Sequence, residues 1–150
     1  MIVIVASFLM TADAHALNIS LSGVKTVKIE LEDKAKGACW TNLKEVREYA
    51  EEKFRIKGIE VVDDYPKSNG RVVFEKGMYW LSLKVISDRV FTDGSGPCIG
   101  LIQITIFTYV WIDNIRHVAG LNSFTSRSIN KTNLNNYTIQ AVQKLFDDFQ

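Results

Sequence analysis

One stretch, residues 99–112, constrains the fold of this 150-residue chain more than any other. From residue 102 onward its even positions are aliphatic apart from Thr108, whereas its odd positions are polar and then aromatic. Alternation of this length is typical of a β-strand, because successive side chains of a strand point to opposite faces of the sheet. The aliphatic face must therefore belong to a core, and the strand must lie in a sheet that is covered on that face.

Other segments supply the rest of the sheet and its cover. Period-2 alternation and bounding turn residues predict further strands at residues 27–32, 59–63, 71–74, 78–87 and 117–128. Residues 43–57 and 134–149 carry apolar side chains at helical spacing and predict two amphipathic helices. Asn42 and Glu45 match a capping box at the start of the first helix, and Gly58 suits its C-terminal cap.

This order of elements predicts an α/β fold of the α+β type. Each amphipathic helix needs a sheet face for its apolar stripe. The economical arrangement is a two-layer sandwich, in which a mostly antiparallel sheet carries both helices on one face. A hydrophobic content of 47% and only two prolines indicate a globular chain. We expect residues 17–150 to form one domain.

The other face of the predicted sheet is the most interesting candidate surface. It carries the odd positions of the long strand, namely Gln103, Thr105, Phe107, Tyr109 and Trp111. An aromatic row on an uncovered sheet face offers a large contact area at a low entropic cost, which favours a binding interface. The alternatives are a sheet that curls over its own aromatic side chains, or ordinary strand propensity.

The N-terminus indicates export. Residues 1–10 are an apolar run, and Ala14-His15-Ala16 follows it as a small-residue cleavage site, so residues 1–16 are interpreted as a signal peptide. No Lys or Arg precedes the run, and the alternative is a buried N-terminal strand, since residues 2–5 are β-branched. The run has about half of the roughly 20 apolar residues that a transmembrane anchor needs. We therefore expect no transmembrane anchor, and a periplasmic or secreted protein.

Two cysteines, Cys39 and Cys98, are consistent with that location. An even number of cysteines in an exported chain favours pairing. The bridge would contribute roughly 4 kcal/mol in the chain-entropy model. The alternatives are a buried free thiol or a reactive thiol, and the spacing resembles no metal site.

Composition and motifs argue against several functions. The chain has 18 basic and 17 acidic residues, and removal of Asp13 with residues 1–16 leaves 18 − 16 = +2, too mild a charge for nucleic-acid binding. His117 is the only histidine after residue 16, and the loop at residues 93–96 lacks the helix that a phosphate site needs. Nothing in the spacing of the loop aspartates selects a catalytic pair; these are Asp63, Asp64, Asp88, Asp93 and Asp113. We predict no catalytic residue, no metal site and no cofactor.

Several structural motifs carry a resemblance. A Cys precedes the first helix, Lys57-Gly58-Ile59-Glu60-Val61 ends it, residues 79–83 read Tyr-Trp-Leu-Ser-Leu, and residues 141–149 close the last helix. In these features the chain resembles small uncharacterised exported bacterial α/β proteins with no assigned activity. The order of elements is also similar to that of envelope assembly domains such as the lipopolysaccharide-assembly lipoprotein and the amino-terminal domain of the TolB translocation protein. The resemblance implies the fold and an extracytoplasmic compartment, and no chemistry.

Together these observations predict an exported, non-enzymatic interaction or accessory protein of the cell envelope with an unknown protein partner. The first alternative is a periplasmic small-ligand-binding protein, which would need an enclosed pocket between sheet and helices. The second is a hydrolase, which would need His117 beside an aspartate in a cleft. The sequence leaves the oligomeric state open.

Overall fold

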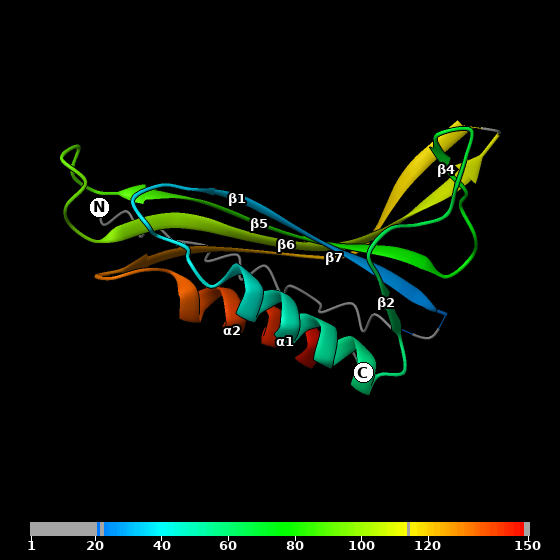
Figure 1. Ribbon diagram of the computed structural model, residues 1–150, viewed down its shortest axis with the longest axis horizontal. Coiled ribbons are helices and arrows are strands. Elements are labelled where there is room, and N and C mark those ends of the chain that lie inside the picture. The colour runs from blue at the N-terminus through cyan, green and yellow to red at the C-terminus, as the bar shows by residue number, and fades with distance from the viewer. Residues whose placement is uncertain (1–20, 22, 114, 149–150) are drawn as a thin grey trace, which may run out of the picture.

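The computed structural model describes residues 21, 23–113 and 115–148 and contains one large sheet with two helices (Figure 1). The predicted signal peptide, residues 1–16, lies outside the described residues. The sheet has the strand order β2-β1-β5-β6-β7. In chain order the elements are β1 (Thr26–Ala35), α1 (Leu43–Ile56), β2 (Glu60–Val62), β3 (Lys67–Ser68), β4 (Arg71–Val72), β5 (Met78–Arg89), β6 (Cys98–Ile112), β7 (Ile115–Asn130) and α2 (Asn135–Asp147).

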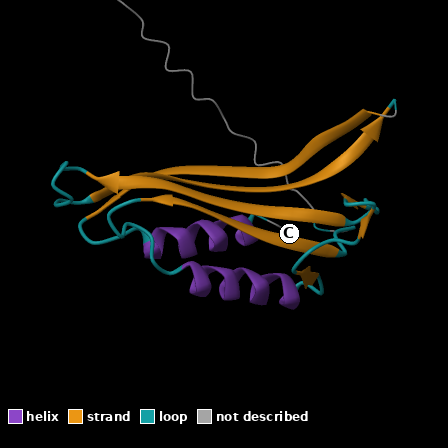
Figure 2. Ribbon diagram, turned by 45° about the horizontal axis from the view of Figure 1, so that its top comes forward, coloured by secondary structure: helices purple, strands orange, loops and turns teal. Residues whose placement is uncertain are grey.

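The sheet is mixed. β1 runs parallel to β2 and to β5, whereas β5–β6 and β6–β7 are antiparallel and account for most of the paired residues. Both helices lie on the same face of the sheet (Figure 2). The predicted α+β fold with two helices on one face of an open sheet is therefore confirmed.

Two crossover connections join parallel strands, one on each face of the sheet. The connection from β1 to β2 contains α1 and lies on the helix-covered face. The connection from β2 to β5, residues 63–77, returns past β1 in the opposite direction and packs on the other face. Parallel crossover connections share one hand. The first crossover leads from β1 to β2, and the second leads back across the sheet from β2 to β5. Two crossovers that move in opposite directions have the same hand only if they lie on opposite faces of the sheet, and these two do.

The main core lies between the sheet and the helices. The strands contribute fully buried aliphatic side chains, including Leu81, Leu83, Val85, Ile102, Ile104 and Ile106. The helices oppose them with Val46, Ala50, Phe54, Val142 and Leu145. Phe54 and Phe146 meet edge-to-face, with ring centroids 4.7 Å apart, and join the two helices. The aliphatic face predicted for residues 102–106 is therefore core.

The ends of the helices confirm one predicted cap and correct another. Ile59 N–H donates to the Phe54 carbonyl and Gly58 N–H to the Arg55 carbonyl, which forms a Schellman motif with Gly58 at a φ of 74°. The predicted capping box is wrong: the Asn42 side chain accepts no N–H of the first turn. Its amide instead donates to Glu45 and to the carbonyl of Asn135, at 3.1 and 3.4 Å, and so connects the beginnings of α1 and α2.

Candidate interaction surface

The face of the sheet that lacks helices carries a second hydrophobic cluster. Tyr65, Met78 and Trp80 are buried there, and Val62, Val72, Phe74, Phe107 and Tyr109 pack around them. We call this set the aromatic cluster. Trp80 makes an edge-to-face contact with Tyr65 at 4.6 Å and another with Tyr109 at 5.0 Å between ring centroids. The crossover of residues 63–77 therefore covers part of the face that faces away from the helices.

A buried hydroxyl fixes this crossover to the sheet. Tyr65 Oη donates to the main-chain carbonyl of Thr26 or Tyr79, and it accepts from the Tyr79 N–H at 3.0 Å. Burial raises the pKa of Tyr65 because the ionised phenol would lose its hydration. The hydroxyl therefore stays protonated and bridges β1 and β5 beneath the crossover.

An exposed ion-pair network ties the same crossover to β1. The Asp64 carboxylate contacts Lys67 and lies 3.2 Å from Lys28, while Lys28 also lies 3.2 Å from Glu30. Hydrogen bonds from Lys67 and Lys28, and one from the Tyr65 N–H, lower the pKa of Asp64 to about 2. Asp64 is thus a structural acid at the start of the crossover.

The five predicted interface residues fall into three environments. Phe107 and Tyr109 are partly buried in the aromatic cluster. Gln103 is exposed, and the Thr105 hydroxyl lies 3.3 Å from that of Ser123 on β7. Trp111 is 60% exposed. The row is therefore covered at its centre and open at both ends.

Trp111 belongs to a segment that extends beyond the rest of the sheet. The pairing of β6 with β5 ends at Phe107 opposite Trp80, whereas β6 and β7 stay paired as far as Ile112 and Ile115. We call residues 108–112 and 115–119 the projecting ribbon, and Figure 1 shows it in yellow, rising away from the sheet. Two-stranded ribbons are marginally stable alone, so this one depends on contacts with neighbouring elements.

The projecting ribbon exposes large apolar side chains on both of its faces. Trp111 and Val118 lie on the face of the aromatic cluster, and Val110, Ile112 and Ile115 lie on the opposite face. Val110 is 36% exposed and the other three aliphatic side chains are 56–64% exposed. The prediction that the whole aliphatic face of residues 99–112 is core is therefore wrong for Val110 and Ile112, because the strand outruns the helices that cover it.

Arg116 attaches one face of the projecting ribbon to the aromatic cluster. Its guanidinium lies 4.8 Å from the ring centroid of Tyr109 and 5.4 Å from that of Phe74. These distances are within the range of cation–π attraction. Phe74 in turn contacts Tyr109 edge-to-face at 4.9 Å. The crossover thus supports the ribbon on this face.

Two clefts border the projecting ribbon. The first has a volume of about 380 Å³ and lies between residues 74–77 and 79 on one side and β6 residues 108–111 on the other. The second has a volume of about 530 Å³ and is lined by Gly70, Arg71, Val72, Phe74, Trp111 and Arg116. Because Phe74 and Trp111 line both, the clefts adjoin. The sequence predicted neither the ribbon nor the clefts. The aromatic row was the only sequence pattern that pointed to this part of the molecule.

Of the aspartates considered with His117, Asp113 lies in the turn of the same hairpin, whereas Asp88 and Asp93 lie apart from it. His117 is exposed and pairs with Val110 in the projecting ribbon, whereas Asp88 pairs with Ile99 near the other end of β6 and Asp93 follows in the β5–β6 loop. Across residues 21, 23–113 and 115–148, no three His, Cys, Asp or Glu side chains are grouped as a metal site would require. No helix in that same part of the chain is long and apolar enough to cross a membrane.

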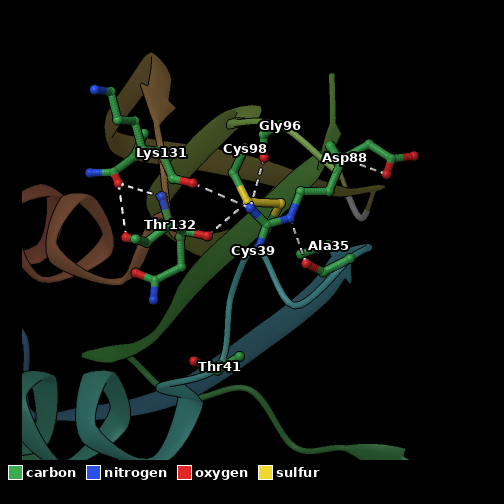
Figure 3. The surroundings of a disulfide bond; sticks show 12 residues. Ala35, Cys39, Thr41, Asp88, Gly96, Cys98, Lys131 and Thr132 are labelled. Carbon is green, nitrogen blue, oxygen red and sulfur yellow. Dashed lines mark hydrogen bonds between the residues drawn. A yellow bond between two sulfur atoms is a disulfide. The ribbon is translucent and has the colours of Figure 1, made fainter. Parts of the chain in front are cut away.

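The predicted disulfide between Cys39 and Cys98 is present (Figure 3). Because Cys98 is the first residue of β6, the bond lies at the end of the sheet opposite the projecting ribbon. It joins the β1–α1 loop to the first residue of β6, and both cysteines are fully buried. Arg89 reinforces the junction by donating to the carbonyls of Gly37 and Gly96, both at 2.9 Å, and of Lys131 at 3.4 Å. One bond and one guanidinium therefore hold three loops together.

Some solved structures are distantly similar to this chain. No protein-family model and no curated protein matches the sequence. The PelC dodecamer from Paraburkholderia phytofirmans is similar in structure, with 15% identity, a TM-score of 0.48, and coverage of 85% of this chain and 89% of that chain. A minor lipoprotein from Acinetobacter baumannii aligns with 8% identity, a TM-score of 0.41, and coverage of 84% and 90%. The likeness to both is distant.

Proposed function

We propose that this protein is an exported, non-enzymatic interaction module of the cell envelope, and that it binds another protein through the projecting ribbon. The observation that carries the proposal is the apolar character of the ribbon on both faces. Contiguous exposed apolar surface on a soluble domain is typical of an interaction site, because its exposure to water is costly unless a partner covers it. Trp111, at 60% exposure, is its largest exposed side chain.

The disulfide supports the proposed location. Bridges such as Cys39–Cys98 persist in oxidising compartments and are rare where thiols are kept reduced. A periplasmic or secreted protein would meet that condition. The apolar N-terminal run is consistent with export to such a compartment.

The structure favours the two alternatives less. A small-ligand carrier would need an enclosed pocket, but the space between sheet and helices is occupied by fully buried side chains such as Phe54, Ile104 and Leu145. A hydrolase that used His117 with Asp88 or Asp93 would need these residues close together, and they lie toward opposite ends of β6. Asp113 lies nearer to His117, in the turn between β6 and β7, but both side chains are exposed.

Site-specific photocross-linking in intact cells tests the proposal. A photoreactive amino acid is placed at position 112 or at position 118, on the two faces of the projecting ribbon, and at the exposed position 140 on α2 as a control. We expect one protein to be cross-linked from positions 112 and 118 and not from position 140. Cross-linking to no protein from either ribbon position, or to the same protein from all three positions, would contradict a ribbon-mediated interaction.

A further inference from the structure

We propose that the clefts beside Trp111 bind an extended acidic peptide segment, which adds a strand to the free edge of β6 next to the point where β5 begins. This inference rests on the proposed function and specifies the chemistry of the partner. It combines three observations: a strand edge that is unpaired within the described residues, two adjoining clefts of which the first lies beside that edge, and guanidinium groups that have no carboxylate partner among those residues.

The unpaired edge is the first observation. β5 pairs with β6 only as far as Trp80 opposite Phe107, although β5 itself begins two residues earlier, at Met78. Beyond that point the Thr108 hydroxyl donates to the Met78 carbonyl at 2.7 Å, and no strand of the described chain pairs with this side of residues 108–112. Alternate residues of this segment therefore direct main-chain N–H and C=O groups away from β7. An extended peptide can pair with such groups.

The first cleft gives such a peptide a place beside this edge. It lies between residues 108–111 of β6 and the turn at residues 74–77, with a volume of about 380 Å³. A strand residue spans about 3.3 Å, so a five-residue peptide would cover residues 108–112. Edge strands of natural sheets are usually short, covered or charged. This edge segment instead contains the uncharged side chains Tyr109, Val110 and Trp111.

Charge favours an acidic peptide. Arg71 and Arg116 line the second cleft, and neither forms an ion pair with a carboxylate of the described residues. The walls of the two clefts together carry Arg71, Lys76 and Arg116 against the single carboxylate of Glu75. A surplus of positive charge beside Phe74 and Trp111 is complementary to carboxylates, with the aromatic rings contacting the methylene groups of the acidic side chains.

The two faces of the ribbon then specify the order of residues in the peptide. Tyr109, Trp111 and Arg116 lie on one face of the ribbon, whereas Val110 and Ile112 lie on the other. Side chains of an added strand alternate between the same two faces. Acidic residues would therefore alternate with aliphatic residues, with the acids on the arginine side and the aliphatic side chains beside Val110 and Ile112.

Fluorescence anisotropy with a defined peptide tests this inference on the purified chain. The probe is fluorescein-labelled Thr-Val-Glu-Val-Glu-Val-Thr, and its matched control has Gln in place of both Glu. We expect the Glu peptide to bind, and to bind about fivefold or more tightly than the Gln peptide, because exposed ion pairs each contribute up to a few-fold in affinity. Equal binding of the two peptides, or no binding of either, would overturn the inference.

Two protein variants and one exchange measurement locate the peptide. Arg71→Glu should weaken the Glu peptide about fivefold or more, and Arg127→Glu, at an exposed arginine near the other end of β7, should change its affinity less than twofold. Hydrogen exchange should slow at residues 108–112 when the peptide binds. Slowing along the outer edge of β7 instead, or equal effects of the two variants, would contradict pairing with β6.

Further ligands separate this inference from the proposed function. Polygalacturonate and vesicles of anionic phospholipid carry negative charge without a peptide main chain. Arg71-dependent binding of either, with no binding of the Glu peptide, would overturn the peptide assignment. If the peptides fail but photocross-linking from positions 112 and 118 captures one protein, the inference is wrong and the proposed function stands. If cross-linking fails and the peptide binds as expected, the inference stands as a property of the isolated chain.

Discussion

Trp80 stacks on Phe107 across the β5–β6 pair, with ring centroids 5.8 Å apart and an interplanar angle of 10°. These two residues are the last pair of the β5–β6 ladder before the strands diverge. Trp80 is 6% exposed, whereas Trp111, farther along the same face of β6, is 60% exposed. The two tryptophans therefore separate the stabilising part of this face from the part available to a partner.

Replacement of each tryptophan should distinguish these roles. Trp80→Ala removes a buried ring and should lower the free energy of unfolding by about 3–5 kcal/mol. Trp111→Ala should change it by about 0.5 kcal/mol or less, since exposed side chains contribute little. Denaturant unfolding measures both. A large loss of stability for Trp111→Ala would identify Trp111 as part of the core and weaken the proposed interface.

Loss of the Cys39–Cys98 bridge should destabilise the protein without changing its topology. The double variant Cys39→Ser/Cys98→Ser should lose about 2–5 kcal/mol in the free energy of unfolding, mainly because its unfolded chain is less constrained. Thermal unfolding of the variant and of the reduced wild type should then agree. Arg89→Ala, which removes three hydrogen bonds between the same loops, should add a further loss in the double variant. An unchanged melting temperature on reduction would contradict a stabilising bridge.

Two strand glycines should respond differently to a methyl group. A Cβ at Gly100 would lie 2.4 Å from the Ser87 Cβ and 2.6 Å from the Ile86 carbonyl oxygen, whereas one at Gly120 would meet nothing within 4 Å. Gly100→Ala should therefore cost about 1–3 kcal/mol through overpacking. Gly120→Ala should be neutral or slightly stabilising, because alanine restricts the unfolded chain. Equal melting temperatures for the two variants would show that β5 and β6 separate easily at this position.

Acid should weaken the attachment of the crossover. The hydrogen bonds from Lys67 and Lys28 lower the pKa of Asp64 from 3.8 to about 2. A lowered folded-state pKa means that the stabilising contribution is complete above the unfolded pKa and is lost as the pH falls through the folded value. Wild-type stability should therefore fall more steeply than that of Asp64→Asn between about pH 4 and pH 2.

Chemical unfolding at several pH values measures how much more stability the wild type loses in acid than Asp64→Asn does. Lys67→Met should reduce it, since Lys67 contributes the largest part of the shift. Parallel pH profiles for the wild type and Asp64→Asn would contradict the assigned role of Asp64.

Local patterns in the sequence were sufficient to predict most elements of the fold. The alternation of residues 99–112 matches β6 almost to its ends, and the helical spacing of residues 43–57 matches α1. These patterns report which side of an element is buried, a property that each element carries in its own sequence. Pairing and orientation depend on distant segments, and so the parallel pairings of β1 with β2 and β5 were not predicted.

The candidate surface was less predictable for a related reason. The aromatic row was recognised from its spacing, but its cover arises from residues 63–77, which read only as a turn and a short strand. Likewise Asn42 has the sequence of a helix cap but contacts Asn135, 93 residues away. A side chain with one polar amide serves whichever partner the tertiary structure brings closest, and periodicity contains no information on that choice.

The passage of the chain across β1 has a consequence for how this protein can change. Because it runs over the face away from the helices, its exposed residues can vary while the core between the sheet and the helices keeps its packing, as is usual for surface connections. Residues 70–77 of this passage also form walls of both clefts. The walls that this passage contributes to the clefts thus lie apart from the main core, so a lineage of such proteins can acquire new partners by altering exposed positions of one connection while its main core stays unchanged.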